Sequence, residues 1–423
     1  MPSVFTRYQK FVVAVLAFLQ FTIILDFMII SPLGFFLLRD MHITTRQFGL
    51  VVSAYAFSAG ASGLLAAGFA DKFDRKRLLL FFYVGFLLGT ALCGVANSYP
   101  FLVGARIVTG VFGGVIGSIV MAIVADLFPL QVRGRVMGTI QTAFAASQVF
   151  GLPLGWELAN RWGWHVPFIM ILAVGAPVGV VIALRLQPIV EHLKIPSTRN
   201  PVRHLVATIG QERYLQTFLA TMMLATGGFM LMPFGSTFTM NNLGISAAHV
   251  KWIYMATGAV TLVTGPLLGK VADVIGKYKL FAIGSIAGAV LVGIYCNLGR
   301  TPLYAVLGLN AVLFVAITCR MISASALISA VPDLPDRGAF MSVNASVQQF
   351  SGGLASSLAG MIVVQAADGH LEHYPVLGWV VMSVMTLVML LMYPINRAVM
   401  RKSAAQAQAV GPGPAPITVA AAE

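Results

Sequence analysis

Two charged residues, Asp26 and Arg106, interrupt segments that are otherwise apolar. Asp26 is the only acidic residue well inside such a segment. A charge in hydrocarbon is costly unless it faces a cavity or a partner. If both segments are helices, at about 1.5 Å per residue Asp26 lies roughly 18 Å from one end of its helix and Arg106 roughly 9 Å from the matching end. A long arginine side chain can bridge much of that difference, so we expect the two residues to pair.

The carboxyl group of Asp26 is suited to carrying protons. Burial away from water favours the protonated acid, whereas an approaching guanidinium favours the carboxylate. A conformational change that alternates these conditions would bind and release a proton, so Asp26 and Arg106 are candidate proton-coupling residues. The alternative is a static buried pair that only orients the two helices.

The composition places most of the chain in a membrane. Of its 423 residues, 58% are hydrophobic and 10% are charged, and the mean hydropathy is +0.87. Because lipid offers the backbone no hydrogen-bond partner, the apolar runs must be helices of about 20 residues. Breaks at charged, proline and glycine residues give twelve candidate helices, near residues 11–38, 47–70, 78–97, 100–126, 136–158, 165–187, 214–240, 249–269, 279–298, 302–328, 339–366 and 374–396. The expected fold class is an all-α membrane protein with twelve transmembrane helices.

Basic residues are distributed unequally between the two sides of these helices. With the N-terminus in the cytoplasm, the cytoplasmic segments hold 20 of the 27 lysines and arginines, and the external segments hold five. Lys and Arg are retained on the cytoplasmic side. We therefore expect a multi-pass protein of the inner or plasma membrane with both termini cytoplasmic. The net charge of +13 follows from this topology and suits anionic lipid head groups, and it does not indicate nucleic-acid binding.

Two short segments recur at half the length of the chain. Asp71–Arg77 returns in weaker form as Asp273–Lys279, 202 residues later, and Arg133-Gly134 returns as Arg337-Gly338, 204 residues later. Because each half has an even number of helices, the halves are expected to be parallel repeats. The expected domains are a six-helix bundle over residues 1–187, a cytoplasmic linker over 188–213, a second six-helix bundle over 214–400 and a disordered cytoplasmic tail over 401–423.

These motifs resemble those of the major facilitator superfamily, and within it the twelve-helix drug/proton antiporters and the sugar-efflux-like permeases. The resemblance covers about residues 10–400. It rests on Gly68-x-x-Asp71-Lys72-x-x-Arg75-Lys76-Arg77, which is similar to the loop between helices 2 and 3, and on Arg106-x-x-x-Gly110-x-x-Gly113-x-x-x-Gly117 in helix 4. Asp74 stands where this loop usually has glycine. Helix 5 carries only Gly151-x-Pro153-x-Gly155, a departure that weakens the antiporter assignment but not that of the fold.

The resemblance implies a cytoplasmic gate around the loop of Asp71. A carboxylate at a helix end can meet the positive N-terminus of a neighbouring helix, here the one expected to begin near Gly338. Arg75 is expected to pair with Asp126, and such a cluster would hold the two halves together until they rock apart. The alternative is a solvated turn whose basic residues only fix the topology. The gate candidates are Asp71, Arg75, Asp126, Arg133 and Asp273.

Polar and aromatic residues inside the apolar runs are candidates for a substrate cavity. They are Tyr55, Gln141, Gln148, Phe229, Asn310, Arg320 and Gln348. The sequence has no phosphate-binding loop of the Gly-x-x-x-x-Gly-Lys-Ser/Thr type and no clustered Met/His ligand pattern. We therefore expect no enzymatic activity, no metal and no cofactor, with a proton gradient as the source of energy.

The function expected from these observations is secondary active transport by alternating access, with proton-coupled efflux of a small organic molecule of drug-like character. Metabolite uptake by symport or facilitated diffusion remains open, as does a transport-inactive sensor with the same fold. The expected partners are a small-molecule substrate and the lipid bilayer, without nucleic acid, and the chain is expected to be a monomer.

Overall fold

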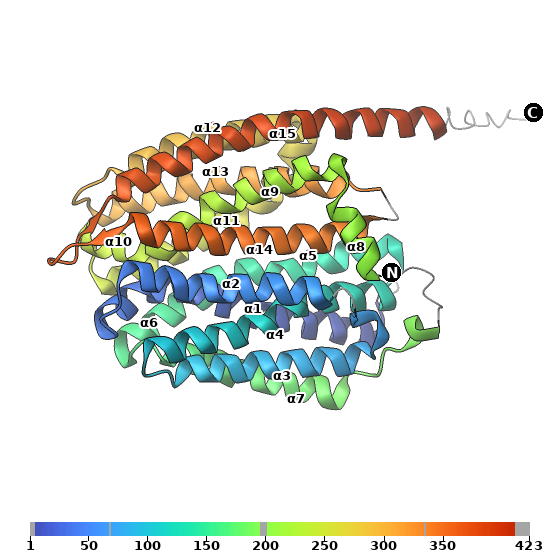
Figure 1. The fold of residues 1–423 in the computed structure, drawn as a ribbon, viewed down its shortest axis with the longest axis horizontal. Coiled ribbons are helices and arrows are strands. Elements are labelled where there is room, and N and C mark those ends of the chain that lie inside the picture. The colour runs from blue at the N-terminus through green and yellow to red at the C-terminus, as the bar shows by residue number, and fades with distance from the viewer. Residues whose placement is uncertain (1–4, 67–68, 195–200, 334–335, 411–423) are drawn as a thin grey trace, which may run out of the picture.

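The computed structural model describes residues 5–66, 69–194, 201–333 and 336–410, and most of them form long helices that lie side by side (Figure 1). The elements of the first half are α1 (Arg7–Asp40), α2 (Thr45–Ala66), η1 (Ala70–Lys72), α3 (Arg75–Gly94), α4 (Tyr99–Leu127), α5 (Leu130–Ala146), η2 (Ser147–Gly151), α6 (Leu152–Trp162), α7 (Val166–Arg185) and η3 (Glu191–Lys194). Those of the second half are α8 (Pro201–Ile209), α9 (Glu212–Leu231), η4 (Met232–Phe234), α10 (Gly235–Asn241), α11 (Ala247–Ile275), α12 (Lys277–Cys296), α13 (Leu303–Ala330), α14 (Arg337–Ile362), β1 (Val364–Gln365), β2 (Leu371–Glu372) and α15 (Tyr374–Val410).

Ten helices among the described residues are long and apolar enough to cross a membrane. Nine are single helices: α1, α2, α3, α4, α7, α11, α12, α13 and α15. The tenth is the run Glu212–Asn241, which joins α9, η4 and α10. Two other stretches are of similar length but carry more polar residues or an interruption: α5 through α6, and α14. The chain is therefore an all-helical, multi-pass membrane protein.

The interruption between α5 and α6 has a local cause. Pro153 lacks a backbone N–H, and its ring would clash with the carbonyl of Val149 in a regular helix. The chain accommodates this with a π-helical turn over Ser147–Gly151, a feature that often marks functional sites. The helix expected over 136–158 is thus longer, 130–162, and is built from three pieces.

Two expectations about the second half are wrong. The helix expected over 339–366 ends at Ile362, because the chain then forms a two-stranded hairpin whose turn uses Gly369 at φ +86°. The disorder expected from residue 401 is wrong for residues 401–410, since α15 continues to Val410. Lys402 to Val410 contains mostly alanine and glutamine, which favour helix, and the first glycine and proline follow only at residues 411 and 412. Residues 411–423 lie outside the described part.

The linker expected over 188–213 connects α7 to α9. It contains the short helices η3 and α8, and α9 begins within it at Glu212. Helix α8 packs against α14 through Leu205 and Thr208, which are both buried. Helix α8 is thus attached to the second bundle, whereas residues 188–194 are attached to the first, because Ile189 donates to the carboxylate of Asp74 and accepts from the backbone N–H of Arg75.

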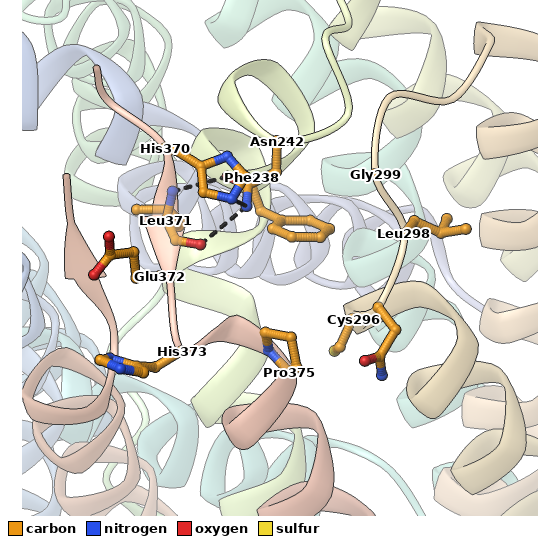
Figure 2. Close-up of a pocket in the computed structure, with 11 residues that line it drawn as sticks. Phe238, Asn242, Cys296, Leu298, Gly299, His370, Leu371, Glu372, His373 and Pro375 are labelled. Carbon is orange, nitrogen blue, oxygen red and sulfur yellow. Dashed lines mark hydrogen bonds between the residues drawn. The ribbon is translucent and has the colours of Figure 1, made fainter. Parts of the chain in front are cut away.

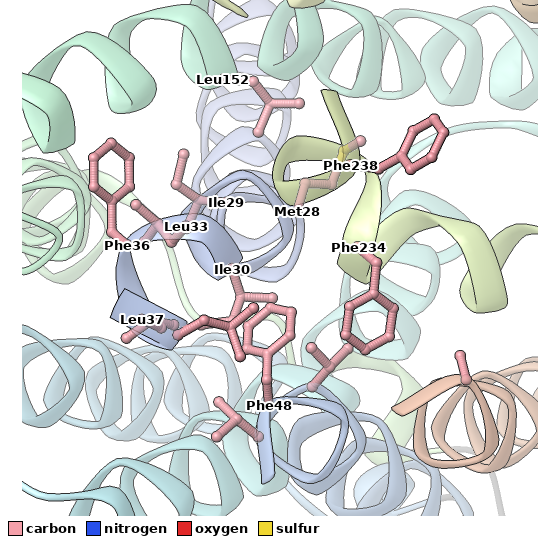
Figure 3. Close-up of a cluster of buried hydrophobic side chains, with 14 of the residues drawn as sticks. Met28, Ile29, Ile30, Leu33, Phe36, Leu37, Phe48, Leu152, Phe234 and Phe238 are labelled. Atoms are coloured by element: carbon pink, nitrogen blue, oxygen red, sulfur yellow. The ribbon is translucent and has the colours of Figure 1, made fainter. Parts of the chain in front are cut away.

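Both chain ends lie at the same end of the helices (Figure 1), which we call the terminal side; the other end is the far side. In the first half, α2 and α3 pack on α4; in the second half, α11 and α12 pack on α13. The two halves meet mainly through α2 and α14. On the far side, α1 also meets η4 and α10, where Phe36, Phe48, Phe234 and their neighbours form one apolar cluster (Figure 3).

The terminal-side half of α11 is unusually exposed. Only 11% of its most apolar window is buried, against 50% for α13. Exposed residues such as Leu262, Val263 and Val271 lie on more than one face of this half. Opposite it, Gln141 and Phe144 of α5 are exposed as well. Because α5 and α6 touch α11 mainly nearer the far side, the two halves are separated along α5 and α11 on the terminal side.

Candidate functional site

Asp26 and Arg106 form an ion pair sealed from solvent. The carboxylate Oδ2 of Asp26 lies 2.9 Å from Nη1 of Arg106, and both side chains are 0% exposed. The hydroxyl of Thr90 donates a hydrogen bond of 3.0 Å to the other carboxylate oxygen. Helices α1, α3 and α4 each supply one of these residues. The expected pairing is thus present, with a third partner in Thr90.

The guanidinium of Arg106 lies over an aromatic face. Its central carbon is 4.5 Å from the centroid of the Tyr55 ring, which is itself buried. Nε and Nη2 of Arg106 have no hydrogen-bond partner among the described residues. The positive charge is therefore stabilised by Asp26 and by the ring quadrupole of Tyr55. Such an arrangement can change when the carboxylate gains a proton, because the ion pair then loses its Coulombic attraction.

Glycines in α4 bring Arg106 and Tyr55 together. A Cβ on Gly110 would meet the backbone of Tyr55, and one on Gly114 would meet the backbone of Ala59. The bare backbone of α4 therefore lets α2 approach closely, as small residues do in membrane helices. Gly117, expected to serve the same purpose, has no neighbour within 4 Å of such a Cβ.

The pair is linked to the second half through aromatic rings. Phe27, next to Asp26 on α1, lies 5.3 Å from Tyr55 and 5.6 Å from Phe229 of α9, measured between ring centroids. The Phe229 carbonyl accepts a hydrogen bond from Ser356 of α14. Two ring contacts, Tyr55–Phe27 and Phe27–Phe229, thus connect the ion-pair site to the second half.

The charged cluster on the terminal side is present in part. Arg75 is buried and pairs with Asp126 at 3.1 Å, as expected, and its Nη1 donates to the carbonyl of Ala70. Arg133 donates to the carbonyls of Ala125 and Phe128, at the end of α4. A cation there compensates the negative end of the helix dipole.

Of the other gate candidates, Asp273 does not join that cluster, and Asp71 cannot be assigned to it. The side chain of Asp71 lies outside the described part, so its contact with the start of α14 remains a prediction. Asp273, near the end of α11, is exposed and has no ion pair among the described residues. Because α11 is separated from the first half on this side, Asp273 has no neighbour there to bind.

The cavity candidates are dispersed. Tyr55 belongs to the ion-pair site, and Phe229 contacts it through Phe27. The others are spread over four helical segments: Gln141 is exposed on α5, Gln148 is buried in η2, Asn310 and Arg320 are buried on α13, and Gln348 is partly buried on α14. The structure therefore assembles the site around Asp26 and leaves these polar residues apart from it.

Arg320 differs from Arg106 in its surroundings. Its Nε donates to the hydroxyl of Ser285 on α12 at 3.1 Å, and its central carbon lies 5.8 Å from the centroid of Phe281. It is only 4% exposed, yet Nη2 has no hydrogen-bond partner among the described residues.

Several contacts near the candidate sites were not predicted from the sequence. Thr90 lies 64 residues from Asp26, and nothing in the sequence of α3 marks it. Asp74 caps α3 by accepting from the backbone of Lys76, and its position before a helix is a recognisable N-cap signal. Glu157 pairs with Lys251 across the two halves on the far side, at 2.9 Å. The Glu157–Lys251 pair can be recognised only from the distance between the two side chains in the structure.

A surface pocket of about 480 Å³ lies on the far side of the second half (Figure 2). Asn242 anchors its rim by binding the backbone N–H and carbonyl of Leu371 in the hairpin, and its Nδ2 lies 3.1 Å from Nε2 of His370. The pocket is formed by loops and helix ends, and the ion-pair residues do not line it. Its polar groups already bind one another, so it is secondary to the ion-pair site.

Comparisons with known proteins agree with this architecture. The model of the Major Facilitator Superfamily matches residues 16–213 and 217–420. Among similar proteins of Bacillus subtilis (strain 168), the uncharacterized MFS-type transporter YceJ is 28% identical over 65% of this chain and 69% of its own length. The uncharacterized MFS-type transporter YtbD is 25% identical over 60% and 63%, and Multidrug resistance protein 3 is 33% identical over 31% and 25%.

Solved structures give the same fold. A bacterial homologue of the human lysosomal transporter Spinster, described as inward-facing and unoccupied, superposes with a TM-score of 0.77 over 94% of this chain and 98% of that one, at 15% identity. The same homologue in an inward-facing, occupied state gives a TM-score of 0.67.

Proposed function

Because the chain belongs to the major facilitator superfamily of transporters, we propose that it exports a small organic molecule in exchange for protons. The observation that carries this proposal is the Asp26–Arg106 pair, which is 0% exposed and lies inside the first bundle. A carboxylate in such a place is expensive, and in membrane proteins it marks a proton or ion pathway.

The proposed cycle alternates the protonation of Asp26. Protonation removes the attraction between Asp26 and Arg106, and the guanidinium then keeps only the ring of Tyr55 and whatever polar group comes near. Since Phe27 connects this site to Phe229 of the second half, the change can bias how the halves pack. Release of the proton restores the pair and the starting arrangement.

The proposed topology has twelve spans in two parallel six-helix repeats, with the linker and both termini in the cytoplasm. The ten apolar helices, the run from α5 through α6, and α14 together supply twelve spans. The corresponding packing of α2 and α3 on α4 and of α11 and α12 on α13 supports the repeat. The excess of basic residues on the terminal side supports the orientation.

With that orientation, the separated halves of α5 and α11 form a cytoplasmic opening, and the far side is closed. Three polar contacts between the halves support closure on the far side: Glu157 with Lys251, the Trp156 indole with the carbonyl of Ala247, and the Thr45 hydroxyl with the carbonyl of Val363. In alternating access, these contacts must break when the transporter opens outward.

Uptake by symport is the second candidate, because the same pair could load a proton together with the substrate. Under symport, substrate and protons enter together. Under antiport they move in opposite directions, so the sign of the proton movement during substrate flux separates the two functions.

The experiment uses the purified chain in proteoliposomes, with a ligand first found by thermal-shift screening of neutral, cationic and acidic compounds. We expect accumulation of that ligand driven by an imposed pH gradient, with protons moving in the opposite direction. Asp26→Asn should abolish accumulation and retain binding, because the amide resembles the protonated acid. The matched control is Asp40→Asn, since Asp40 ends the same helix and pairs only with the exposed Arg39. Full accumulation by Asp26→Asn contradicts the proposal.

A further inference from the structure

Arg320 is a buried cation that has no carboxylate partner among the described residues. The acidic residues between positions 212 and 410 are Glu212, Asp273, Asp333, Asp336, Asp368 and Glu372. All of them lie in the first or last turn of a helix, in a loop or, for Glu372, in the short strand β2. Arg320 is ten residues before the end of α13 at Ala330, which is about 15 Å along the helix axis. The second bundle therefore cannot neutralise Arg320 as Asp26 neutralises Arg106.

A second polar group without a hydrogen-bond partner lies near Arg320 on α13. Ser323 is three residues further along α13 and therefore on the same face. Its side chain is 0% exposed, and its hydroxyl, like Nη2 of Arg320, has no hydrogen-bond partner among the described residues. Two donors without a partner thus lie within one turn of each other on α13, and leaving such groups unsatisfied is costly.

The chemistry of these donors fits an oxyanion. A guanidinium presents several N–H groups in a planar fork that matches a carboxylate or phosphate, and the Ser323 hydroxyl can donate to the same group. The ring of Phe281 beside the guanidinium gives an apolar surface for the rest of such a ligand. A single hydrogen bond to Ser285 anchors the side chain, so the guanidinium can turn toward a ligand while its stem stays packed.

The position of α13 places Arg320 on the side of the molecule where the two halves are separated. Helix α11 packs on α13, and the terminal-side half of α11 borders the opening between the two halves. Arg320 lies in the terminal-side half of α13, so a ligand that enters the opening approaches this half of the helix.

We propose that Arg320 and Ser323 form a subsite for the acidic group of the substrate, a carboxylate or phosphate carried by an organic molecule. The inference rests on the proposed transport function, and it assigns the substrate class: organic acids rather than neutral or cationic compounds.

The test is binding by the purified full chain in phosphatidylcholine nanodiscs, without any proton gradient. The probes are 1-naphthoate and 1-naphthyl phosphate, with the uncharged 1-naphthamide and 1-naphthol as matched controls, and inorganic phosphate and chloride as free anions. We expect the acids to bind the wild-type chain at least about 10-fold more tightly than the uncharged compounds, since a hydrogen bond to a charged group is worth about that factor.

Arg320→Gln should remove the preference for acids, and Ser323→Ala should reduce it. Arg300→Gln is the control, because Arg300 is an exposed arginine in the loop before α13. If Arg320→Gln cannot be purified, Ser285→Asp decides the matter: it places a carboxylate beside the guanidinium, so it should abolish acid binding in a folded protein.

Absence of acid binding in the wild type, or acid binding that survives both Arg320→Gln and Ser285→Asp, overturns the subsite. The subsite is also overturned if inorganic phosphate, chloride or added phosphatidylglycerol reproduces in full the effect seen with the naphthyl acids. Binding of acids through Arg320 without gradient-driven accumulation would leave the subsite standing and contradict proton-coupled export. Proton-coupled export of uncharged compounds that is unaffected by Arg320→Gln would contradict the subsite and leave the proposed export function standing.

Discussion

Arg106 and Arg320 are buried in the middle of helices in the two halves of this transporter, and their surroundings differ. Arg106 has a carboxylate at 2.9 Å and an aromatic ring beneath it. Arg320 has one serine hydroxyl and the nearby ring of Phe281. A buried cation with its own carboxylate creates an internal site that can titrate. A buried cation without one requires a negative charge from outside the chain. Under the proposed function, the first half carries the proton and the second half binds the charge of the substrate.

Removing one partner of the internal pair should have the largest effect. Arg106→Gln leaves Asp26 buried without a cation, so the carboxyl group should stay protonated and coupling should be lost. Breaking a buried pair in this way costs about 3–5 kcal/mol. We expect a clear drop in melting temperature and no accumulation under a pH gradient.

The double variant Asp26→Asn/Arg106→Gln serves as the control for that prediction. It removes both charges, so it should recover much of the lost stability without recovering coupling. Equal destabilisation by the single and double variants would mean that the pair is not the source of the effect.

Supplying the missing carboxylate should make the second half resemble the first. Ser285→Asp is expected to pair with Arg320 and to stabilise the protein by about 1–3 kcal/mol, the range for hydrogen bonds between charged groups. Thermal unfolding without ligand measures this gain. Ser285→Asn is the matched control, because it has the same shape without the charge. A lower melting temperature for Ser285→Asp than for Ser285→Asn would show that Arg320 is not lacking a negative partner.

The cross-half pair on the far side should have a smaller effect. Lys251 and Glu157 are 28% and 22% exposed, so their interaction is worth about 1 kcal/mol or less. Glu157→Gln should shift the population toward the outward-open state, because the pair exists only when the far side is closed. Labelling of a cysteine introduced near Ala247 by an impermeant reagent measures the shift. Arg161→Gln is the control, since Arg161 contacts Glu157 from within the same half. Unchanged labelling in Glu157→Gln would mean that the Glu157–Lys251 pair does not help to keep the far side closed.

The smallest effect is expected at the terminal side of the second half. Lys402 and Arg213 both bind Asp333, and these contacts hold the pKa of Asp333 below its ordinary value. Since the folded state favours the ionised form, the stabilisation is present above the ordinary pKa of an aspartate and is lost as the pH falls through the lowered value. Because the side chain is 45% exposed, the effect is about 1 kcal/mol or less. Asp333→Asn should flatten the acid limb of the stability profile slightly, and an unchanged profile would exclude a role for this contact.

Much of this arrangement could be predicted from the sequence because it follows from rules that act locally. Apolar runs predicted the helices, and the cost of intramembrane charge predicted that Asp26 and Arg106 would pair. Arg75 and Asp126 could be paired because both lie at helix ends on the same side.

Other features depend on packing and leave little trace in the sequence. Thr90 is one hydroxyl among many in apolar runs, and only the close packing of α3 on α4 brings it to Asp26. The hairpin after α14 and the extension of α15 were missed because short strands and alanine-rich tails carry weak signals. The isolation of Arg320 is partly visible in the sequence, since no acidic residue lies near it on α13. Its burial against Ser285 required the structure.

The exchange of a proton for substrate at Asp26 is the central claim, and calorimetry of ligand binding tests it most directly. Binding heats measured in buffers of different ionisation enthalpy report how many protons are released or taken up. The account predicts that the wild-type chain and Asp40→Asn release protons when the ligand binds, and that Asp26→Asn binds the ligand without release. Proton release by Asp26→Asn equal to that of the wild type, or proton uptake by the wild type, would contradict it.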